Sequence, residues 1–156
     1  MMRLLNLSDN EPDKVVTKGT QVAQVTQGAQ VEQKETKSLK KLGDEGEQKA
    51  VNFLTGKGYR IVERNWRTRR GEIDIIADTG DTIVFAEVKT LPSGNLQTLE
   101  KELGRLKQKR IVETAKCFLS KYRQYNCRYV RFDVIIVDMP DFESVYHIEN
   151  AFSEYV

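Results

Sequence analysis

Residues 71–89 read GEIDIIADTGDTIVFAEVK, two runs rich in Ile and Val on either side of a short polar turn. β-Branched residues favour strands, and a short connection containing Asp and Gly favours an antiparallel hairpin. The same segment carries acids where a buried strand would hold apolar side chains: Glu72, Asp74 and Glu87. Ionic side chains on a strongly strand-forming pair are typical of a metal site. We therefore expect a hairpin that belongs to the core and also carries chemistry.

The register of this hairpin depends on the length of its turn. If Asp78 and Asp81 are paired, alternation places one apolar set on a single face: Ile73, Ile75, Ala77, Val84, Ala86 and Val88. The opposite face then carries Glu72, Asp74, Glu87 and Lys89. In this register Glu72 lies directly across from Glu87 and Asp74 lies diagonally to it, with the carboxylates about 5–8 Å apart. A turn of odd length would break this arrangement.

Carboxylates this close repel one another. Two charges about 5 Å apart repel by about 3 kcal/mol at an effective dielectric constant near 20. Either water solvates the patch, with Lys89 as the local counter-ion, or a bound cation removes the repulsion. The solvated face is the ordinary interpretation of an isolated Glu-x-Lys sequence, so the hairpin alone does not decide between the two.

The composition of the 156 residues changes along the chain. The first aromatic residue is Phe53, and residues 9–38 consist mainly of Gln, Thr, Lys, Glu and Val. Such a segment buries too little apolar surface to offset the loss of chain entropy. We expect a disordered tail over residues 1–37 and one domain over residues 38–156. The alternating Val residues of the tail offer a second interpretation, an edge strand added to a partner.

Cysteine, histidine and the N-terminal sequence exclude several classes of protein. The opening stretch, MMRLLNL, is too short and too soon polar for a signal peptide or a membrane span. Cys117 and Cys127 lack zinc-ligand spacing and fit a reducing compartment. The only histidine, His147, argues against a Cys/His metal cluster or a serine triad, and we expect it to be structural. These features favour a cytoplasmic protein without membrane contact.

The net charge of +2 hides a strong segregation of charge. Residues 57–131 contain seventeen Lys or Arg and nine Asp or Glu, whereas residues 132–156 contain six acids and no Lys or Arg. Basic residues precede and follow the acidic hairpin: Arg60, Arg64, Arg67, Arg69 and Arg70, then Lys101, Arg105, Lys107, Lys109 and Arg110. A basic middle suits a polyanion such as nucleic acid, although solvated faces account for most charge runs.

Two helices are expected from apolar residues at helical spacing. The first covers residues 38–57, with Ser38 as its cap and Gly58 as its stop, and buries Leu39, Leu42, Gly46, Ala50, Phe53 and Leu54. The second covers residues 99–123, with Gly104 weakening or splitting it. Its predicted sheet-facing residues are Leu99, Leu103, Leu106, Ala115, Phe118, Leu119 and Tyr122.

Strands are expected on both sides of the second helix. Beside the hairpin they cover residues 59–66, 131–138 and 146–152. The resulting order, αβββαββ, predicts an α/β (α+β) fold in which helices flank a mixed sheet. Because the second helix separates two strands, its crossover allows one parallel pair.

The order of the acids resembles the PD-(D/E)xK restriction-endonuclease-like superfamily, which has an acid on a helix, Asp on a strand and Glu-x-Lys on the next. Here these residues are Glu47, Asp74, Glu87 and Lys89. Seven blocks within residues 42–152 more closely resemble the YraN family, small bacterial predicted endonucleases similar to archaeal Holliday junction resolvases. The blocks are GExxA (46–50), RNxR (64–67), GEIDII (71–76), FxEVK (85–89), KQ (107–108), RFDV (131–134) and IENAF (148–152). Residues 1–37 lie outside the resemblance, and Thr90 replaces an expected Arg.

The resemblance implies a restriction-endonuclease-like fold and a metal-dependent DNA endonuclease that hydrolyses phosphodiester bonds, with branched or structured DNA as substrate. It implies Mg²⁺ or Mn²⁺ held by Asp74, Glu87 and the carbonyl of Val88, with Glu47 binding directly or through water, because hard cations take oxygen ligands. Lys89 would orient or deprotonate the attacking water or steady the phosphate. Glu72 would either bind metal or pair with an arginine such as Arg67.

The expected nucleic-acid contacts are Arg64, Arg67, Arg70 and Lys107, with an ordinary surface lysine as the alternative for Lys107. Two other functions stay open. One is a non-catalytic nucleic-acid-binding adaptor that retains the nuclease fold, and the other is a partner-docking protein in which the basic middle and acidic C-terminus drive self-association. The acids favour the enzyme, because a DNA-binding surface without catalytic duty gains nothing from carboxylates facing phosphate. A homodimer would suit a symmetric junction.

Overall fold

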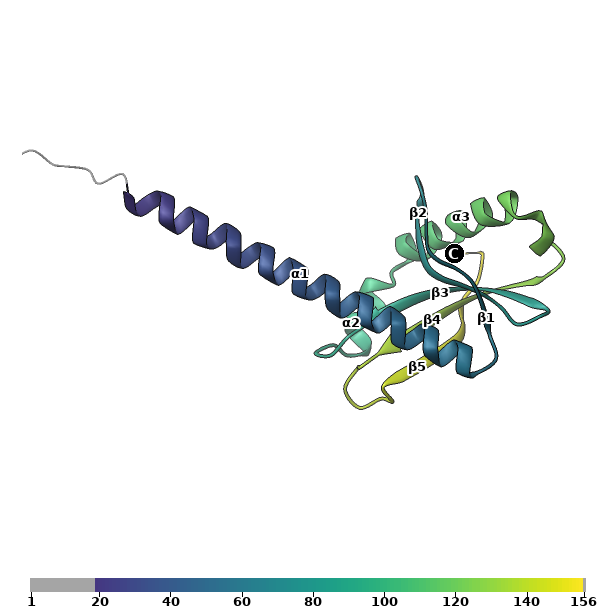
Figure 1. The fold of residues 1–156 in the computed structure, drawn as a ribbon. Helices are drawn as coiled ribbons and strands as arrows, with labels where there is room; N and C mark the ends of the chain where they lie inside the picture. The colour runs from purple at the N-terminus through teal and green to yellow at the C-terminus, as the bar shows by residue number, and fades with distance from the viewer. Residues whose placement is uncertain (1–18, 156) are drawn as a thin grey trace, which may run out of the picture. The chain divides into compact units, whose positions relative to one another are not determined.

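The structure is a computed structural model that describes residues 19–155, with side chains from residue 31 onward. Three α-helices, five strands and one short 3₁₀ helix follow one another along the described chain (Figure 1). They are α1 (Gly19–Gly56), β1 (Arg60–Thr68), β2 (Gly71–Asp78), β3 (Thr82–Thr90), α2 (Leu96–Glu102), α3 (Arg105–Lys121), η1 (Arg123–Tyr125), β4 (Tyr129–Val137) and β5 (Val145–Phe152). This order confirms the expected α/β fold.

The five strands form one mixed sheet in the order β1-β2-β3-β4-β5. Neighbouring strands are antiparallel except β3 and β4, which are parallel. The segment that joins this pair contains α2 and α3, so the expected helical crossover is confirmed. The architecture is that of a restriction-endonuclease-like mixed sheet flanked by helices.

Helices cover both faces of the central strands. On one face, the C-terminal part of α1 packs against the sheet through Ala50 and Leu54, which contact a core of Ile75, Ala77, Val84, Ala86, Ile135 and Val137. On the other face, α2 and α3 contribute Leu99, Ile111 and Phe118 to a larger core with Ile76, Phe85 and Phe132. Burial on both faces explains why β3 and β4 are nearly continuous apolar runs rather than alternating ones.

The first helix differs from the sequence-based expectation. It begins at Gly19, so residues 19–37 are helical where a disordered tail is expected, while residues 1–18 lie outside the described part. Gln, Ala, Glu and Lys are good helix formers, and the helix continues on propensity because side chains 31–40 are exposed. Leu39, expected in the core, is 70% exposed.

The described chain divides into two units at the boundary between Lys37 and Ser38. That residues 38–156 form the domain responsible for function stays a prediction. Within residues 19–155, no helix is both long and apolar enough to cross a membrane.

The expected end of the first helix at Gly58 is confirmed, whereas Ser38, expected as its N-terminal cap, lies inside α1. Gly58 adopts φ 87°, and the N–H of Tyr59 donates to the carbonyl of Leu54 at 3.0 Å, which closes the last turn of α1. The second helical segment is split at Gly104, as its sequence allows, and starts earlier than expected because Asn95 caps α2. The break also changes the buried stripe, since Leu106 is 65% exposed rather than facing the sheet.

The register of the β2–β3 hairpin is two residues away from the expected one. Ile75 pairs with Ala86 and Asp78 pairs with Ile83, because the turn runs from Thr79 to Thr82 rather than between paired Asp78 and Asp81. The N–H of Thr79 donates to the carbonyl of Thr82 at 3.0 Å. Gly80, at φ 103°, donates its N–H to the Asp78 carboxylate at 2.7 Å.

The apolar face of the hairpin is confirmed with one exception. The turn has even length, so Ile75 and Ala77 still share a face with Val84 and Ala86. Ile73 belongs instead to the core under α3, where Trp66, its partner on β1, also packs. The β1–β2 ribbon turns toward α3 beyond the last β2–β3 pair, and this twist moves Ile73 to the other side.

Candidate functional site

The acidic residues lie where β2 and β3 separate. β2 remains paired with β1 as far as Gly71, and β3 remains paired with β4 as far as Thr90, but β2 and β3 pair only from Ile75 and Ala86 to the turn. The strands therefore fork at Asp74 and Glu87. At the fork the N–H of Val88 donates to the Asp74 Oδ2 atom at 2.8 Å, so a carboxylate takes the place of a strand partner.

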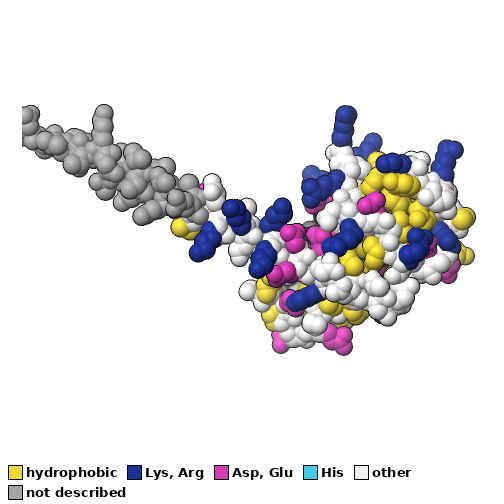
Figure 2. Space-filling model, in the orientation of Figure 1, with side chains coloured by type: hydrophobic (Ala, Val, Ile, Leu, Met, Phe, Trp, Pro, Cys, Tyr) yellow, Lys and Arg dark blue, Asp and Glu magenta, His cyan; other side chains and the backbone are white. Residues whose placement is uncertain are grey.

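A cavity of about 300 Å³ opens at this fork. All four residues expected from the superfamily pattern line it: Glu47, Asp74, Glu87 and Lys89. The other lining residues are Leu39, Leu42, Gly43, Glu72, Val88, Thr90, Glu102 and Lys107. On the face shown in Figure 2, Asp and Glu side chains gather beside Lys and Arg side chains. We call this cavity, with these lining residues, the acidic cavity.

Asp74 has an unfavourable environment for its negative charge. Burial, and next the neighbouring Glu87 carboxylate, raise the pKa of Asp74 to about 7, against the opposing hydrogen bond from Val88. Asp74 and Glu87 lie directly beyond Ile75 and Ala86, the last pair of the corrected register, instead of lying diagonally as expected from the sequence. A bound cation would relieve this repulsion.

Glu87 is almost completely buried, with 3% of its side chain exposed. Its Oε1 atom forms ion pairs with two lysines, Lys107 at 2.9 Å and Lys89 at 3.3 Å. Its Oε2 atom is buried and has no hydrogen-bond partner among the described residues. A buried carboxylate oxygen without a donor is costly, so this atom is the clearest candidate ligand in the cavity.

Lys89 is held between two acids. Its ammonium lies 3.3 Å from both Glu87 and Glu102. Burial alone would lower the pKa of Lys89, but the carboxylates of Glu87 and Glu102 outweigh it and raise the pKa. Lys89 is therefore a cation at neutral pH, a state that suits orienting water or steadying phosphate and not removing a proton.

Glu47 and Glu72 have local partners at the edge of the cavity. Asn65, on β1, donates its side-chain amide to Glu47 at 2.9 Å. Asn65 adopts φ 51°, a left-handed conformation that Asn tolerates better than most residues. Arg67 pairs with Glu72 at 3.1 Å, which is the second of the two roles considered for Glu72.

The acidic cavity offers oxygen atoms that a divalent cation could use as ligands. Among the described side chains, residues 31–155, no three His, Cys, Asp or Glu are grouped as ready-made metal ligands. Lysines contact Glu87, and Asn65 contacts Glu47. The donor set nevertheless fits a hard cation, since Glu87 has an orphaned buried oxygen and Asp74 is destabilised by its neighbour. A cation would have to displace Lys107 or share Glu87 with it.

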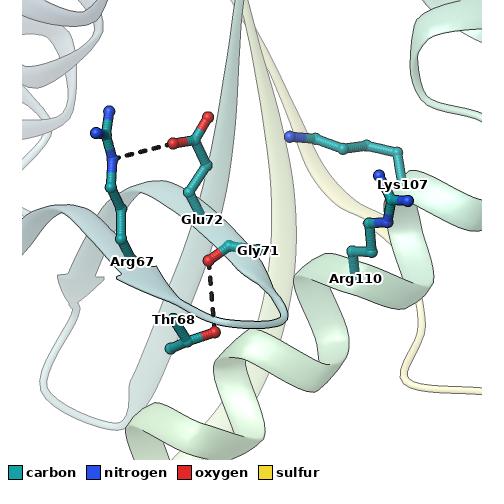
Figure 3. Close-up of a pocket in the computed structure, with 6 residues that line it drawn as sticks. All are labelled: Arg67, Thr68, Gly71, Glu72, Lys107 and Arg110. Atoms are coloured by element: carbon teal, nitrogen blue, oxygen red, sulfur yellow. Dashed lines mark hydrogen bonds and ion pairs between the residues drawn. The ribbon is translucent and has the colours of Figure 1, made fainter.

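Of the four expected nucleic-acid contacts, two line one cavity and two have polar partners outside it. Arg64 donates to Gln48 at 3.0 Å, and Arg70 donates to Glu113 at 3.0 Å. Arg67 and Lys107 do come together, in a second cavity of about 330 Å³ lined also by Thr68, Gly71, Glu72 and Arg110 (Figure 3). We call this the basic cavity. From the sequence, Arg110 was named only as part of a basic run and not as an expected contact, although its position three residues after Lys107 places both on one face of a helix.

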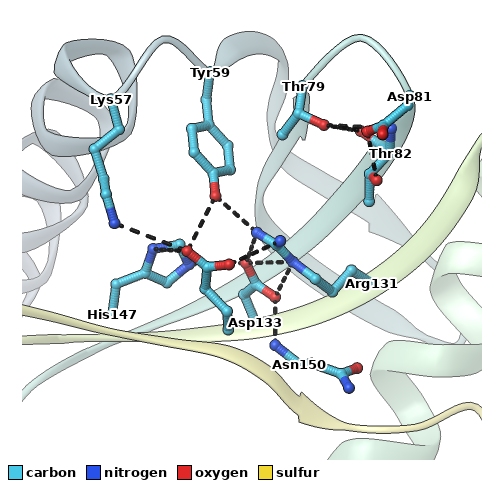
Figure 4. A network of polar contacts seen from close by, with 10 residues as sticks. Lys57, Tyr59, Thr79, Asp81, Thr82, Arg131, Asp133, His147 and Asn150 are labelled. Atoms are coloured by element: carbon cyan, nitrogen blue, oxygen red, sulfur yellow. Dashed lines mark hydrogen bonds and ion pairs between the residues drawn. The ribbon is translucent and has the colours of Figure 1, made fainter.

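A buried polar network that sequence reasoning missed surrounds Asp133 on β4 (Figure 4). This fully buried carboxylate accepts from Arg131 at 2.9 Å and from the N–H of Asn150 at 2.9 Å, and lies 2.8 Å from Nε2 of His147. Burial raises the pKa of Asp133, but the hydrogen bonds from His147, Arg131 and Asn150 outweigh it and lower the pKa. The Arg-x-Asp spacing, which puts both side chains on one strand face, was the available signal.

The role of this network is to join β4 to β5. His147 contacts Asp133 with only 2% of its side chain exposed, in agreement with a structural role. Neither Asp133 nor His147 lines the acidic cavity.

Known proteins share this sequence over most of its length. Residues 46–137 match the profile described as "Uncharacterised protein family UPF0102". A UPF0102 protein of Treponema denticola is 42% identical over 127 residues, which cover 74% of this chain and 98% of the relative. A UPF0102 protein of Treponema pallidum is 47% identical over 121 residues, covering 75% and 96%, and one of Persephonella marina is 44% identical over 110 residues, covering 70% and 91%. The chain belongs to the UPF0102 family, which is the YraN family.

Proposed function

We propose that this protein is a divalent-metal-dependent DNA endonuclease that hydrolyses phosphodiester bonds at the acidic cavity. The observation that carries the proposal is the pair of carboxylates at the strand fork. Burial, and next the neighbouring Glu87 carboxylate, raise the pKa of Asp74 to about 7, and Glu87 keeps a buried oxygen without a donor among the described residues. A fold that maintains this repulsion, beside lysines, favours a site for a cation and a phosphate.

The residues that would hold the cation are Asp74, Glu87 and the carbonyl of Val88, with Glu47 contributing directly or through water. Bound there, Mg²⁺ or Mn²⁺ would stabilise negative charge developing on the phosphate and make a coordinated water more acidic. We infer Mg²⁺ as the first ion to test, because a set of oxygen donors suits it.

The lysines would act on the phosphate and the water. Lys89 keeps its proton beside Glu87 and Glu102, so we assign it to orienting the attacking water and steadying the phosphate, and not to removing a proton. Lys107, 2.9 Å from Glu87, can turn to a phosphate oxygen when a metal takes over that carboxylate. Branched DNA is the first substrate to test, by analogy with the superfamily.

The test is cleavage of junction, flap and linear duplex DNA with Mg²⁺, with Mn²⁺ and with EDTA. Asp74→Ala and Glu87→Ala should abolish metal-dependent cleavage, because each removes a proposed ligand. Glu143→Ala, at an exposed acid outside the acidic cavity, should leave it unchanged. Equal cleavage by all three variants would mean a contaminating nuclease and would remove the basis of the proposal.

A second function has one observation in its favour. Two lysines already neutralise Glu87, so the cavity is partly balanced in charge without a metal. A non-catalytic nucleic-acid-binding adaptor would therefore show salt-sensitive DNA binding without any stabilisation by Mg²⁺. Light scattering of the free and DNA-bound protein would at the same time test the proposed homodimer.

A further inference from the structure

The basic cavity combines residues from two elements that are far apart in sequence. The end of the β1–β2 hairpin supplies Arg67, and α3 supplies Lys107 and Arg110 (Figure 3). Gly71 permits this approach, because a Cβ at that position would lie 3.2 Å from the Thr114 hydroxyl and 3.5 Å from the Cβ of Arg110. The close packing of hairpin and helix brings the two arginines to one cavity.

The residues that line the basic cavity carry more positive than negative charge. Its lining contains three basic side chains and one acid, Glu72. Arg110 is exposed and makes no ion pair within the part of the chain that the structure describes. Arg67 does pair with Glu72, but both side chains are largely exposed, at 72% and 47%, so this pair is weak and easily exchanged.

The chemistry of these side chains selects the ligand. Two guanidinium groups offer planar pairs of N–H donors that match the oxygens of a phosphate. Both arginines line this one cavity, so a phosphate that replaces Glu72 at Arg67 would lie in the same cavity as Arg110. The site is open to solvent, which suits a group on a long polymer.

The two cavities share part of their lining. Glu72 and Lys107 belong to both, and Lys107 reaches Glu87 in the acidic cavity. A nucleic-acid strand with one phosphate at the acidic cavity would therefore carry a nearby phosphate past Arg67 and Arg110. Such a contact positions the strand without reading its sequence.

We propose that Arg67 and Arg110 form a binding site for a backbone phosphate of a nucleic-acid strand, adjacent to the acidic cavity. Arg67 and Arg110 hold the phosphate from opposite sides of the basic cavity, and Lys107 separates it from Glu87. The assignment of the strand to this face rests on the proposed nuclease function, but binding at the site requires neither a metal nor cleavage.

The experiment measures binding in EDTA, so that no metal and no cleavage contribute. A fluorescein-labelled single-stranded oligodeoxynucleotide of about 12 nucleotides is titrated by fluorescence anisotropy at low salt. Arg110→Gln and Arg67→Gln should each weaken binding about tenfold or more, because each removes a charged hydrogen-bonding group from a phosphate. The slope of log Kd against log salt concentration should be smaller by about 0.7 in each variant than in the wild type.

Matched controls carry the same loss of one charge outside the basic cavity. Arg105→Gln on α3 and Arg69→Gln, between β1 and β2, should change binding less than twofold. Because Arg67→Gln leaves Glu72 without its partner and able to repel a phosphate, the double variant Arg67→Gln/Glu72→Gln is measured as well. It should still bind severalfold more weakly than the wild type, and recovery of the wild-type affinity would mean that Arg67 only neutralises Glu72. Unfolding midpoints of all variants identify any loss of folding.

The outcomes separate this site from the proposed function. Equal weakening by all four single variants would mean diffuse attraction by the basic surface and would overturn the phosphate site, even if the wild-type protein cleaves DNA. A selective loss in Arg110→Gln and Arg67→Gln without metal-dependent cleavage by the wild type would support the site and leave the adaptor as its function. Inorganic phosphate should compete with the oligonucleotide only in proteins that retain both arginines.

Discussion

Asp74 is the residue at which the proposed function most clearly lowers the stability of the protein. Its carboxylate accepts the Val88 N–H at 2.8 Å, yet burial and Glu87 raise its pKa to about 7. The ionised form is therefore disfavoured in the folded chain relative to the unfolded one. When no cation is bound, such a group lowers the stability of the folded protein. Functional sites commonly reduce stability in this way.

Replacement of Asp74 by Asn should stabilise the metal-free protein at high pH. The folded pKa of about 7 lies above the ordinary value of 3.8, so the folded state loses stability as Asp74 ionises between about pH 4 and pH 7. Asn keeps an acceptor for Val88 and carries no charge. At about pH 8 we expect Asp74→Asn to gain up to about 4 kcal/mol in urea unfolding with EDTA, and below about pH 4 no gain.

The control for this prediction is Asp44→Asn, an exposed acid on α1, which should change stability little at either pH. Equal stability of wild type and Asp74→Asn at about pH 8 would show that neither burial nor Glu87 disfavours the charge of Asp74 in the folded protein.

Lys107 is expected to compete with a metal for Glu87. Without metal, Lys107→Met should lower the free energy of unfolding by about 1–3 kcal/mol, because Glu87 loses its partner at 2.9 Å. With Mg²⁺, the rise in melting temperature should be larger than in the wild type, because the lysine no longer occupies the carboxylate. Lys109→Met, at an exposed neighbour on α3, provides the control, and an unchanged response to Mg²⁺ would place the metal elsewhere.

At the scale of elements, the approach of α1 to the end of β3 places Glu47 beside the fork. Gly46 allows this approach, because a Cβ there would overlap the Oγ1 atom of Thr90. The expectation that Gly46 lies in the buried stripe of α1 is confirmed, and Thr90, which stands where an Arg is expected, has a packing role at this contact.

Two glycines in the same helix should respond in opposite directions to alanine. Gly46→Ala should destabilise the protein by about 1–3 kcal/mol, because the new methyl group overlaps Thr90. Gly43→Ala should stabilise it by up to about 1 kcal/mol, because no atom lies within 4 Å of its added Cβ and Ala is the better helix former. Thermal unfolding would measure both, and Thr90→Ala should recover part of the loss in Gly46→Ala. A gain in stability by Gly46→Ala would contradict the contact.

At the scale of the whole molecule, the two units of the chain should contribute unequally to stability. The described side chains between residue 31 and Ser38 are exposed, whereas both hydrophobic cores consist of residues after Ser38. A protein that begins at Ser38 should therefore unfold within about 0.5 kcal/mol of the full chain, as expected for removal of surface residues. Chemical denaturation measures this difference, and a loss of several kcal/mol would show that the N-terminal segment is part of the domain.

Much of the candidate site follows from local sequence. The Ile- and Val-rich hairpin, the stop at Gly58 and the break at Gly104 depend on backbone preferences of neighbouring residues, and the structure has all three. The placement of Glu47, Asp74, Glu87 and Lys89 around one cavity also agrees with the expectation from the resemblance. The order of these residues along the chain was sufficient to predict that they lie together, because each acid belongs to a helix or strand that the sequence predicts.

The exact pairing of side chains depended on tertiary structure. Register differs by two residues because the turn is stabilised by the side chain of Asp78, and Ile73 changes faces because the β1–β2 ribbon turns toward α3. The helical state of residues 19–37 was missed because composition indicates only that a segment cannot form a core, not whether it is helical.

The sequence by itself determined most of the elements and their order, because these follow from short-range periodicity and from residue types. The resemblance read from the sequence indicated four of the residues that line the acidic cavity. Only the tertiary structure decided which charges meet: Asp74 beside Glu87, Lys107 on Glu87, Arg110 beside Arg67, and Asp133 among Arg131 and His147. These contacts join residues on different elements, and their energies depend on distance and burial, which no local pattern contains.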